Sequence, residues 1–120
     1  MHELSIAVSI VEMAQQEVAE RGVRLSAVHL KLGALTGIVK DSLIASYEMA
    51  CFDTPLQGSR LVMEDVPIVV FCPACQQQRT LPTMQSFACP ERGTPTPEVL
   101  QGRELVVVGL EVVDLVGSVE

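Results

Sequence analysis

The first three residues, Met1, His2 and Glu3, form a small chelator. The terminal amine, the backbone nitrogens of His2 and Glu3, and the His2 imidazole can all reach one metal ion through small rings. Four nitrogens close to one plane suit Ni(II) or Cu(II), whereas Zn(II) prefers a tetrahedron. Initiator methionine is generally kept before a residue as large as histidine, so we expect this geometry in the mature chain. The alternative is a histidine without a ligand, because short motifs often match by chance.

Three cysteines later in the chain form a second candidate metal site. Cys72 and Cys75 enclose Pro-Ala in a tight Cys-x-x-Cys turn, which lets two thiolates meet one Zn(II). Cys89 follows at the spacing of a second zinc knuckle and is shaped by a neighbouring proline and glycine. The sequence therefore predicts a zinc site on Cys72, Cys75 and Cys89.

The fourth position of that second knuckle carries Arg92. A guanidinium stays protonated and cannot ligate a cation, so the site lacks the fourth thiolate of a closed structural zinc site. Glu91, a solvent molecule and Cys51 are the candidates for a fourth ligand. Two other interpretations compete: Cys72 and Cys75 form a redox pair, or zinc is absent and packing alone holds the knuckle.

Composition limits the kind of protein and its partners. The 120 residues are 48% hydrophobic but only 3% aromatic, with no tryptophan, so the core must be aliphatic. A net charge of −7 repels phosphate backbones and argues against nucleic-acid binding. There is no apolar run of about 18 residues to span a membrane and no secretory signal. Four cysteines without an export signal favour reduced thiols or metal ligands, and hence the cytoplasm.

The hydrophobic pattern predicts the elements that position these residues. Apolar residues recur at helical spacing over 4–20, directly after the chelating tripeptide, at Leu4, Ala7, Val8, Val11, Ala14 and Val18. Gly22 is the expected stop of this helix. A second helix is expected over 40–52. Strands are expected over 25–32, 60–66 and 103–113. The last strand is apolar on both faces from Leu105 to Val108, which predicts that it lies at the centre of the sheet.

These elements predict an α+β fold of two helices packed on a three-stranded sheet, with an inserted zinc-ribbon-like module. The expected domains are 1–66 together with 103–120, and the insertion 67–102. His29 lies on the more polar face of its strand, as a solvated or hydrogen-bonded histidine or a supplementary metal ligand. Cys51 falls among packed helix positions and is expected to behave as a small hydrophobe.

Four segments together resemble the HypA/HybF family of nickel metallochaperones, which act in the maturation of nickel-iron hydrogenases. They are Met1-His2-Glu3 opening an amphipathic helix, a strand ending in Lys31-Leu32-Gly33, the zinc ribbon, and Gly102-Arg103-Glu104-Leu105 before the final strand. The resemblance covers essentially the whole chain. It implies nickel binding by His2, with Glu3 contributing through its backbone or side chain, and zinc binding by Cys72, Cys75 and Cys89.

The resemblance also implies a function and partners. The chain is expected to bind Ni(II) at its N-terminus and deliver it, without being an enzyme, while zinc is structural or marks a recognition surface. The implied partners are a nickel-inserting GTPase and the hydrogenase large-subunit precursor, and urease maturation is also conceivable. The departure at Arg92 puts zinc binding in question and leaves the nickel end untouched.

Two alternatives come from other classes of protein. One is a zinc-ribbon interaction module without mobile metal, for which replacing His2 changes nothing. The other is a thiol oxidoreductase that uses Cys72 and Cys75. Against the enzyme, no histidine or helix start is evident nearby to lower a thiol pKa, and no nucleophile–base or phosphate-loop pattern is present.

Overall fold

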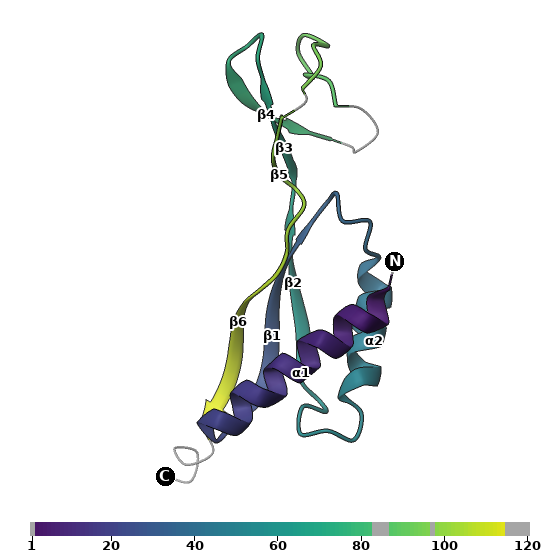
Figure 1. Ribbon diagram of the computed structural model, residues 1–120, viewed down its shortest axis with the longest axis vertical. Coiled ribbons are helices and arrows are strands. Elements are labelled where there is room, and N and C mark those ends of the chain that lie inside the picture. Colours follow the sequence, from purple (N-terminus) through teal and green to yellow (C-terminus); the bar gives the residue numbers. More distant parts are fainter. Residues whose placement is uncertain (1, 83–86, 97, 115–120) are drawn as a thin grey trace. The chain divides into compact units, whose positions relative to one another are not determined.

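The computed structural model describes residues 2–82, 87–96 and 98–114 of the chain (Figure 1). In this part the elements are α1 (Glu3–Arg21), β1 (Val23–Gly33), α2 (Lys40–Cys51), β2 (Arg60–Val66), β3 (Ile68–Cys72), β4 (Gln77–Leu81), β5 (Glu98–Gln101) and β6 (Leu105–Asp114). One three-stranded sheet has the order β2-β1-β6 and the other β4-β3-β5. The predicted α+β fold with an inserted module is confirmed.

The chain divides into two compact units. The first contains residues 1–30, 38–63 and those from 107 on, and the second contains 31–37 and 64–106. No helix in the described residues is long and apolar enough to cross a membrane.

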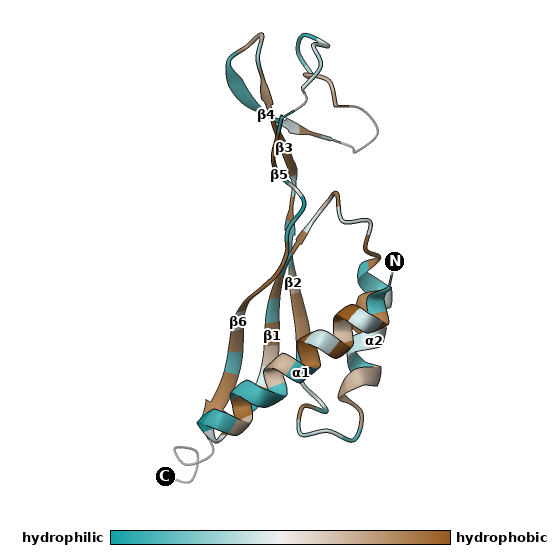
Figure 2. Ribbon diagram, in the orientation of Figure 1, coloured by the Kyte–Doolittle hydropathy of each residue, from teal (hydrophilic) through white to brown (hydrophobic). Residues whose placement is uncertain are grey.

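Helix α1 begins directly after His2 and packs one side into the core of the first unit. Figure 2 shows that its surface alternates between hydrophobic and hydrophilic residues. The buried residues follow helical spacing, at Ala7, Ile10, Val11, Ala14 and Val18. Ile10 was absent from the predicted stripe, whereas Leu4 and Val8, which were in it, are exposed. The helix ends at Gly22, where the sequence placed its stop.

Helix α2 is anchored in the same core through Leu43, Tyr47 and Cys51. The Tyr47 hydroxyl lies 2.7 Å from Ser59 Oγ, and Ser59 Oγ in turn donates to the Leu56 carbonyl oxygen at 2.7 Å. Burial raises the pKa of Tyr47 to about 12, so the phenol stays neutral and donates to Ser59. Cys51 is only 2% exposed, which fits the predicted small hydrophobe.

The central strand of the first sheet is β1, not the final strand. Alternate residues of β1, including Val28 and Leu30, pack into the core, while β6 lies at the edge. The prediction of a central final strand was wrong, since Val106 and Val108 of β6 are 47% and 53% exposed. A run of valines reflects β-propensity, which edge strands share with central ones.

The second unit is built on β3, with β4 and β5 antiparallel on either side of it. Figure 2 shows β3 as a hydrophobic strand. Its buried residues Ile68 and Val70 pack with Leu81 of β4, and partly buried Leu35 and Val99 join them. This small core lies beside Cys72, the last residue of β3.

Two of the motifs that carried the family resemblance meet within the second unit. The Gly33 N–H donates to the Glu104 carbonyl oxygen, and the Leu35 N–H donates to the Gly102 carbonyl oxygen, both at 2.7 Å. The Glu104 carboxylate accepts from the Gly102 N–H at 2.8 Å. A side chain at position 33 would collide with this backbone, which explains why glycine stands there.

Candidate metal centres

His2 lies at the start of α1 and is exposed to solvent. Its carbonyl oxygen accepts the first backbone bond of the helix, from the Ile6 N–H at 3.1 Å. Its imidazole makes no capping hydrogen bond to the helix. Met1 lies outside the described residues. The imidazole predicted to bind nickel is therefore presented to solvent at a fixed helix start.

Glu3 is the first residue of α1, and both its backbone nitrogen and its carboxylate are candidate metal ligands. The N–H groups of a first helical turn have no acceptor within the helix, so the Glu3 nitrogen is not used in the helix ladder. Its carboxylate accepts a hydrogen bond from the Val39 N–H, at 3.4 Å, where α2 begins. A carboxylate is also favoured near the positive end of a helix. The side chain thus ties the tripeptide to α2 and leaves the backbone nitrogen available.

The three predicted cysteine ligands come together in the second unit. The Sγ atoms of Cys72, Cys75 and Cys89 all lie within 4.8 Å of one another. Those of Cys75 and Cys89 are 3.8 Å apart. Zinc–sulfur bonds of about 2.3 Å in a tetrahedron place two sulfurs about 3.8 Å apart. The spacing of the sulfurs therefore fits one zinc ion.

Both cysteine turns have the same backbone conformation. The Gln76 N–H donates to the Cys72 carbonyl oxygen at 2.7 Å, and the Gly93 N–H donates to that of Cys89 at 2.8 Å. The donor residue has a positive φ in each turn, 52° at Gln76 and 69° at Gly93. Arg92 thus occupies the place in the second turn that Cys75 occupies in the first. The second turn therefore shares these two features with the first although it has no second sulfur.

Backbone donors and burial set the acidity of the thiols. Burial raises the pKa of Cys89, but hydrogen bonds from the N–H groups of Glu91 and Arg92 and from the neighbouring thiols together lower it to about 7. The Cys75 N–H donates to the Cys72 sulfur at 3.4 Å and lowers its pKa, yet burial and the neighbouring thiols leave that pKa raised overall. Cys72 is fully buried. A buried thiol with a raised pKa is a poor nucleophile, so Cys72 is not set up as an attacking thiol.

Neither of the two side chains predicted as a fourth zinc ligand joins the cluster. Among the described residues, the group of sulfur, carboxylate and imidazole atoms within 4.8 Å contains only the three cysteines. Cys51 belongs to the core of the first unit. The Glu91 carboxylate lies 3.4 Å from an Nη atom of Arg79.

Arg79 contacts the second cysteine turn through Glu91, which the sequence did not reveal. Hydrogen bonds with Cys75 and Cys89 raise the pKa of its guanidinium. Its place follows from the pairing of β4 with β3, where Arg79 lies opposite buried Val70. The signal in the sequence would have been the register of the β3–β4 hairpin, which pairs Arg79 with an apolar residue.

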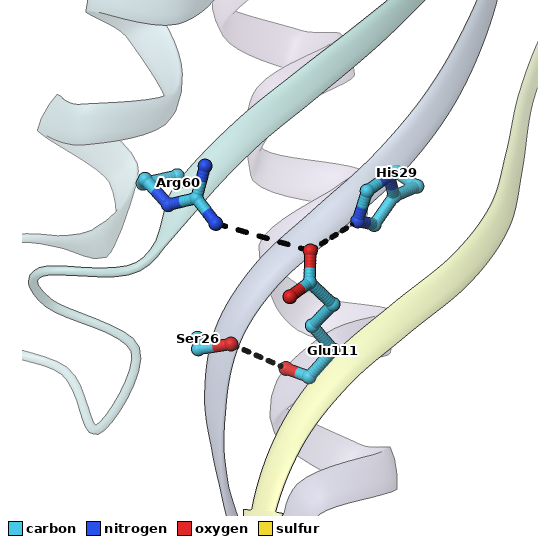
Figure 3. A network of polar contacts seen from close by, with 4 residues as sticks. All are labelled: Ser26, His29, Arg60 and Glu111. Atoms are coloured by element: carbon cyan, nitrogen blue, oxygen red, sulfur yellow. Dashed lines mark hydrogen bonds and ion pairs between the residues drawn. The ribbon is translucent and has the colours of Figure 1, made fainter.

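His29 takes part in a polar network on the face of the first sheet opposite the buried Val28 and Leu30. Its residues come from β1, β2 and β6 (Figure 3). The His29 Nε2 lies 2.5 Å from Glu111 Oε1, and an Arg60 Nη atom lies 3.8 Å from the same oxygen. The hydrogen bond from His29 lowers the pKa of Glu111. His29 is therefore a hydrogen-bonded strand histidine, as one of the two predictions had it.

Comparison with known proteins identifies the relatives of this chain. A family model described as HypA, hydrogenase/urease nickel incorporation, metallochaperone, matches residues 1–112. The chain belongs to the HypA family. The match includes both the N-terminal tripeptide and the three-cysteine centre.

Individual HypA proteins agree with this assignment. The hydrogenase maturation factor HypA of Chloroflexus aurantiacus is 50% identical over 112 residues, covering 92% of this chain and 98% of that protein. The HypA of Deinococcus radiodurans is 38% identical over 106 residues, covering 88% of each chain.

Solved HypA structures share the fold. The solution structure of the Ni metallochaperone HypA from Helicobacter pylori has a TM-score of 0.63 over 94% of this chain and 98% of that one. A second solution structure of a HypA protein has a TM-score of 0.70 over 95% of this chain and 98% of its own. Both are 16% identical to this chain, so they support the fold alone.

Proposed function

We propose that this protein is a nickel metallochaperone that binds Ni(II) at Met1, His2 and Glu3 and delivers it for the maturation of nickel-iron hydrogenase. Membership of a family described by nickel incorporation supports the cargo. The observation that carries the site is the exposed His2, beside a Glu3 nitrogen that the helix ladder does not use. Nitrogen donors in this arrangement suit Ni(II) better than Zn(II).

The position of the tripeptide suits a carrier that has to release its metal. A chaperone needs few ligands in an exposed site, and His2 is exposed. The Glu3 carboxylate, held by the Val39 N–H, keeps the backbone of the tripeptide in place without occupying the metal. Protons compete with the metal for imidazole and amine, so nickel affinity falls as pH drops.

The three-cysteine centre would hold zinc, which would stabilise the second unit by linking its two turns. Thiols that bind metal have to stay reduced, which suits the cytoplasm. The partners we propose are a nickel-inserting GTPase and the hydrogenase large-subunit precursor. The relatives are named hydrogenase maturation factors, which supports a partner within the maturation machinery. In this proposal the α+β body binds nickel and the insertion binds zinc.

The test is a calorimetric titration of Ni(II) into zinc-loaded protein, so that the thiolates are already occupied. His2→Ala should weaken nickel binding by roughly 100-fold or more, because second-shell changes alone cost about 10–100-fold and a lost ligand costs more. His29→Ala is the matched control, since the chain has two histidines, and it should stay within about twofold of wild type. Equal affinities for His2→Ala and wild type would refute the proposal and favour an interaction module without mobile metal.

A further inference from the structure

We propose that the three-cysteine centre is completed from outside the chain. The fourth metal position, for which Arg92 offers no ligand, takes the thiolate of a low-molecular-weight thiol. The proposal rests on the proposed zinc site of Cys72, Cys75 and Cys89, and it names a ligand class that the chain itself does not supply there.

The second unit has no further soft donor to offer the centre. Three of the four cysteines of the chain form the cluster. The fourth, Cys51, is only 2% exposed and belongs to the core of the first unit. Histidine is absent from residues 31–37 and 64–106. Structural zinc almost always takes four ligands, so the unit supplies one ligand too few.

The carboxylate of the second cysteine turn is engaged elsewhere. The Glu91 carboxylate lies 3.4 Å from an Nη atom of Arg79, and it is outside the cluster of ligand atoms in the described residues. The side chain of Arg79 is only 21% exposed. Turning Glu91 towards a metal would leave this mostly buried guanidinium without its carboxylate, which is costly.

The first positions of the two cysteine turns are buried, whereas the second positions reach solvent. Cys72 and Cys89 occupy the first positions and are at most 2% exposed. The matching backbone hydrogen bonds of the turns put Cys75 and Arg92 at the second positions. Cys75 is partly exposed and Arg92 is exposed. The missing ligand therefore belongs to the solvent side of the centre, where an external ligand does not have to enter the core.

Donor type and charge favour a thiolate for this position. Thiolates are soft ligands that select zinc, and a set of four thiolates is common in structural zinc sites. Three thiolates and Zn²⁺ are together anionic, and a fourth thiolate adds to that charge. Arg92 carries a permanent positive charge on the second turn, which opposes this build-up. A small thiol with carboxylates of its own, such as glutathione, suits both the metal and the guanidinium.

The experiment follows the sulfur-to-cobalt charge-transfer absorption of the full chain, loaded with one equivalent of Co(II) in place of zinc, while glutathione is added. In wild type the absorption should rise by about one third, because one thiolate joins three. S-methylglutathione keeps the carboxylates but has no thiolate to give, and it should leave the absorption unchanged. No rise with glutathione would overturn the proposal, and so would a loss of absorption because glutathione extracts the metal.

Two variants separate the possible sources of the fourth ligand. Arg92→Cys supplies a fourth thiolate from the chain, so its absorption should start about one third above wild type and should not respond to glutathione. Glu91→Gln should respond as wild type does. A response in Glu91→Gln but not in wild type would make Glu91 the fourth ligand and overturn the proposal.

Failure of the zinc site itself gives a different result. A wild type without any sulfur-to-cobalt absorption would refute metal binding by the three cysteines, and the external ligand with it. If Arg92→Cys does not fold, the comparison of glutathione with S-methylglutathione on wild type decides alone. A rise with the first and none with the second supports the proposal, and equal responses to both refute it.

Discussion

Replacing Gly33 by alanine tests the close contact between the end of β1 and the segment 102–104 in the second unit. An added Cβ at this position would lie 2.2 Å from the Gly102 carbonyl oxygen, 2.3 Å from the carbonyl carbon of Gly102 and 2.6 Å from the Glu104 nitrogen. All three are backbone atoms, so no side-chain rotation relieves the collision. The two segments have to move apart.

The cost follows from what this separation breaks. Two backbone hydrogen bonds of 2.7 Å, from Gly33 to Glu104 and from Leu35 to Gly102, are lost or lengthened. Each contributes about 1 kcal/mol net. Forcing extra atoms into a packed site costs about 1–3 kcal/mol more. We therefore expect Gly33→Ala to lower the free energy of unfolding of the second unit by about 3–5 kcal/mol.

The assay is equilibrium urea unfolding of zinc-loaded protein, followed by far-ultraviolet circular dichroism. Gly109→Ala is the control, because a Cβ added at Gly109 meets no atom within 4 Å. We expect that variant to stay within about 0.5 kcal/mol of wild type. If Gly33→Ala unfolded at the same urea concentration as Gly109→Ala, the close contact would be wrong.

Two more substitutions test other contacts. Tyr47→Phe removes the hydroxyl that lies 2.7 Å from Ser59 and should cost about 1 kcal/mol in thermal unfolding. Ser59→Ala also removes the donor to the Leu56 carbonyl oxygen, so the double variant should lose less stability than the sum of the two single losses; additive losses would contradict the pairing. Glu111→Gln tests pH dependence. The hydrogen bond from His29 lowers the pKa of Glu111 in the folded protein. The ionised Glu111 therefore stabilises the fold above its unfolded-state pKa, about 4.3, and this stabilisation is lost as pH falls through the folded-state pKa. Wild type should therefore lose more stability than Glu111→Gln on acidification below about pH 5, measured by urea midpoints, and parallel losses would refute the linkage.

Much of the fold could be predicted because it depends on local patterns. The spacing of Ala7, Val11, Ala14 and Val18 predicted α1, and the cysteine spacing predicted the three-sulfur cluster that the structure brings together. Both signals lie within short stretches of sequence or in a fixed turn geometry.

What the sequence missed depends on contacts between distant segments. The run of valines in β6 said nothing of whether that strand is central or at the edge. The final strand was expected from residue 103 but begins at Leu105, after Gly102, whose φ of 125° does not belong to a regular strand. Arg79 lies opposite Val70 through the register of β4 on β3, and it contacts Glu91 of the second cysteine turn. The nickel ligands His2 and Glu3 stay a prediction.

The most direct measurement of the central claim is Ni K-edge X-ray absorption on the protein loaded with one equivalent of Ni(II). Three thiols of this chain are an alternative nickel site, and sulfur is distinguished from nitrogen in the first shell. We expect a shell of nitrogen and oxygen only in wild type, with the imidazole scattering lost in His2→Ala. Sulfur scattering in wild type that survives His2→Ala would contradict nickel binding at the N-terminal tripeptide.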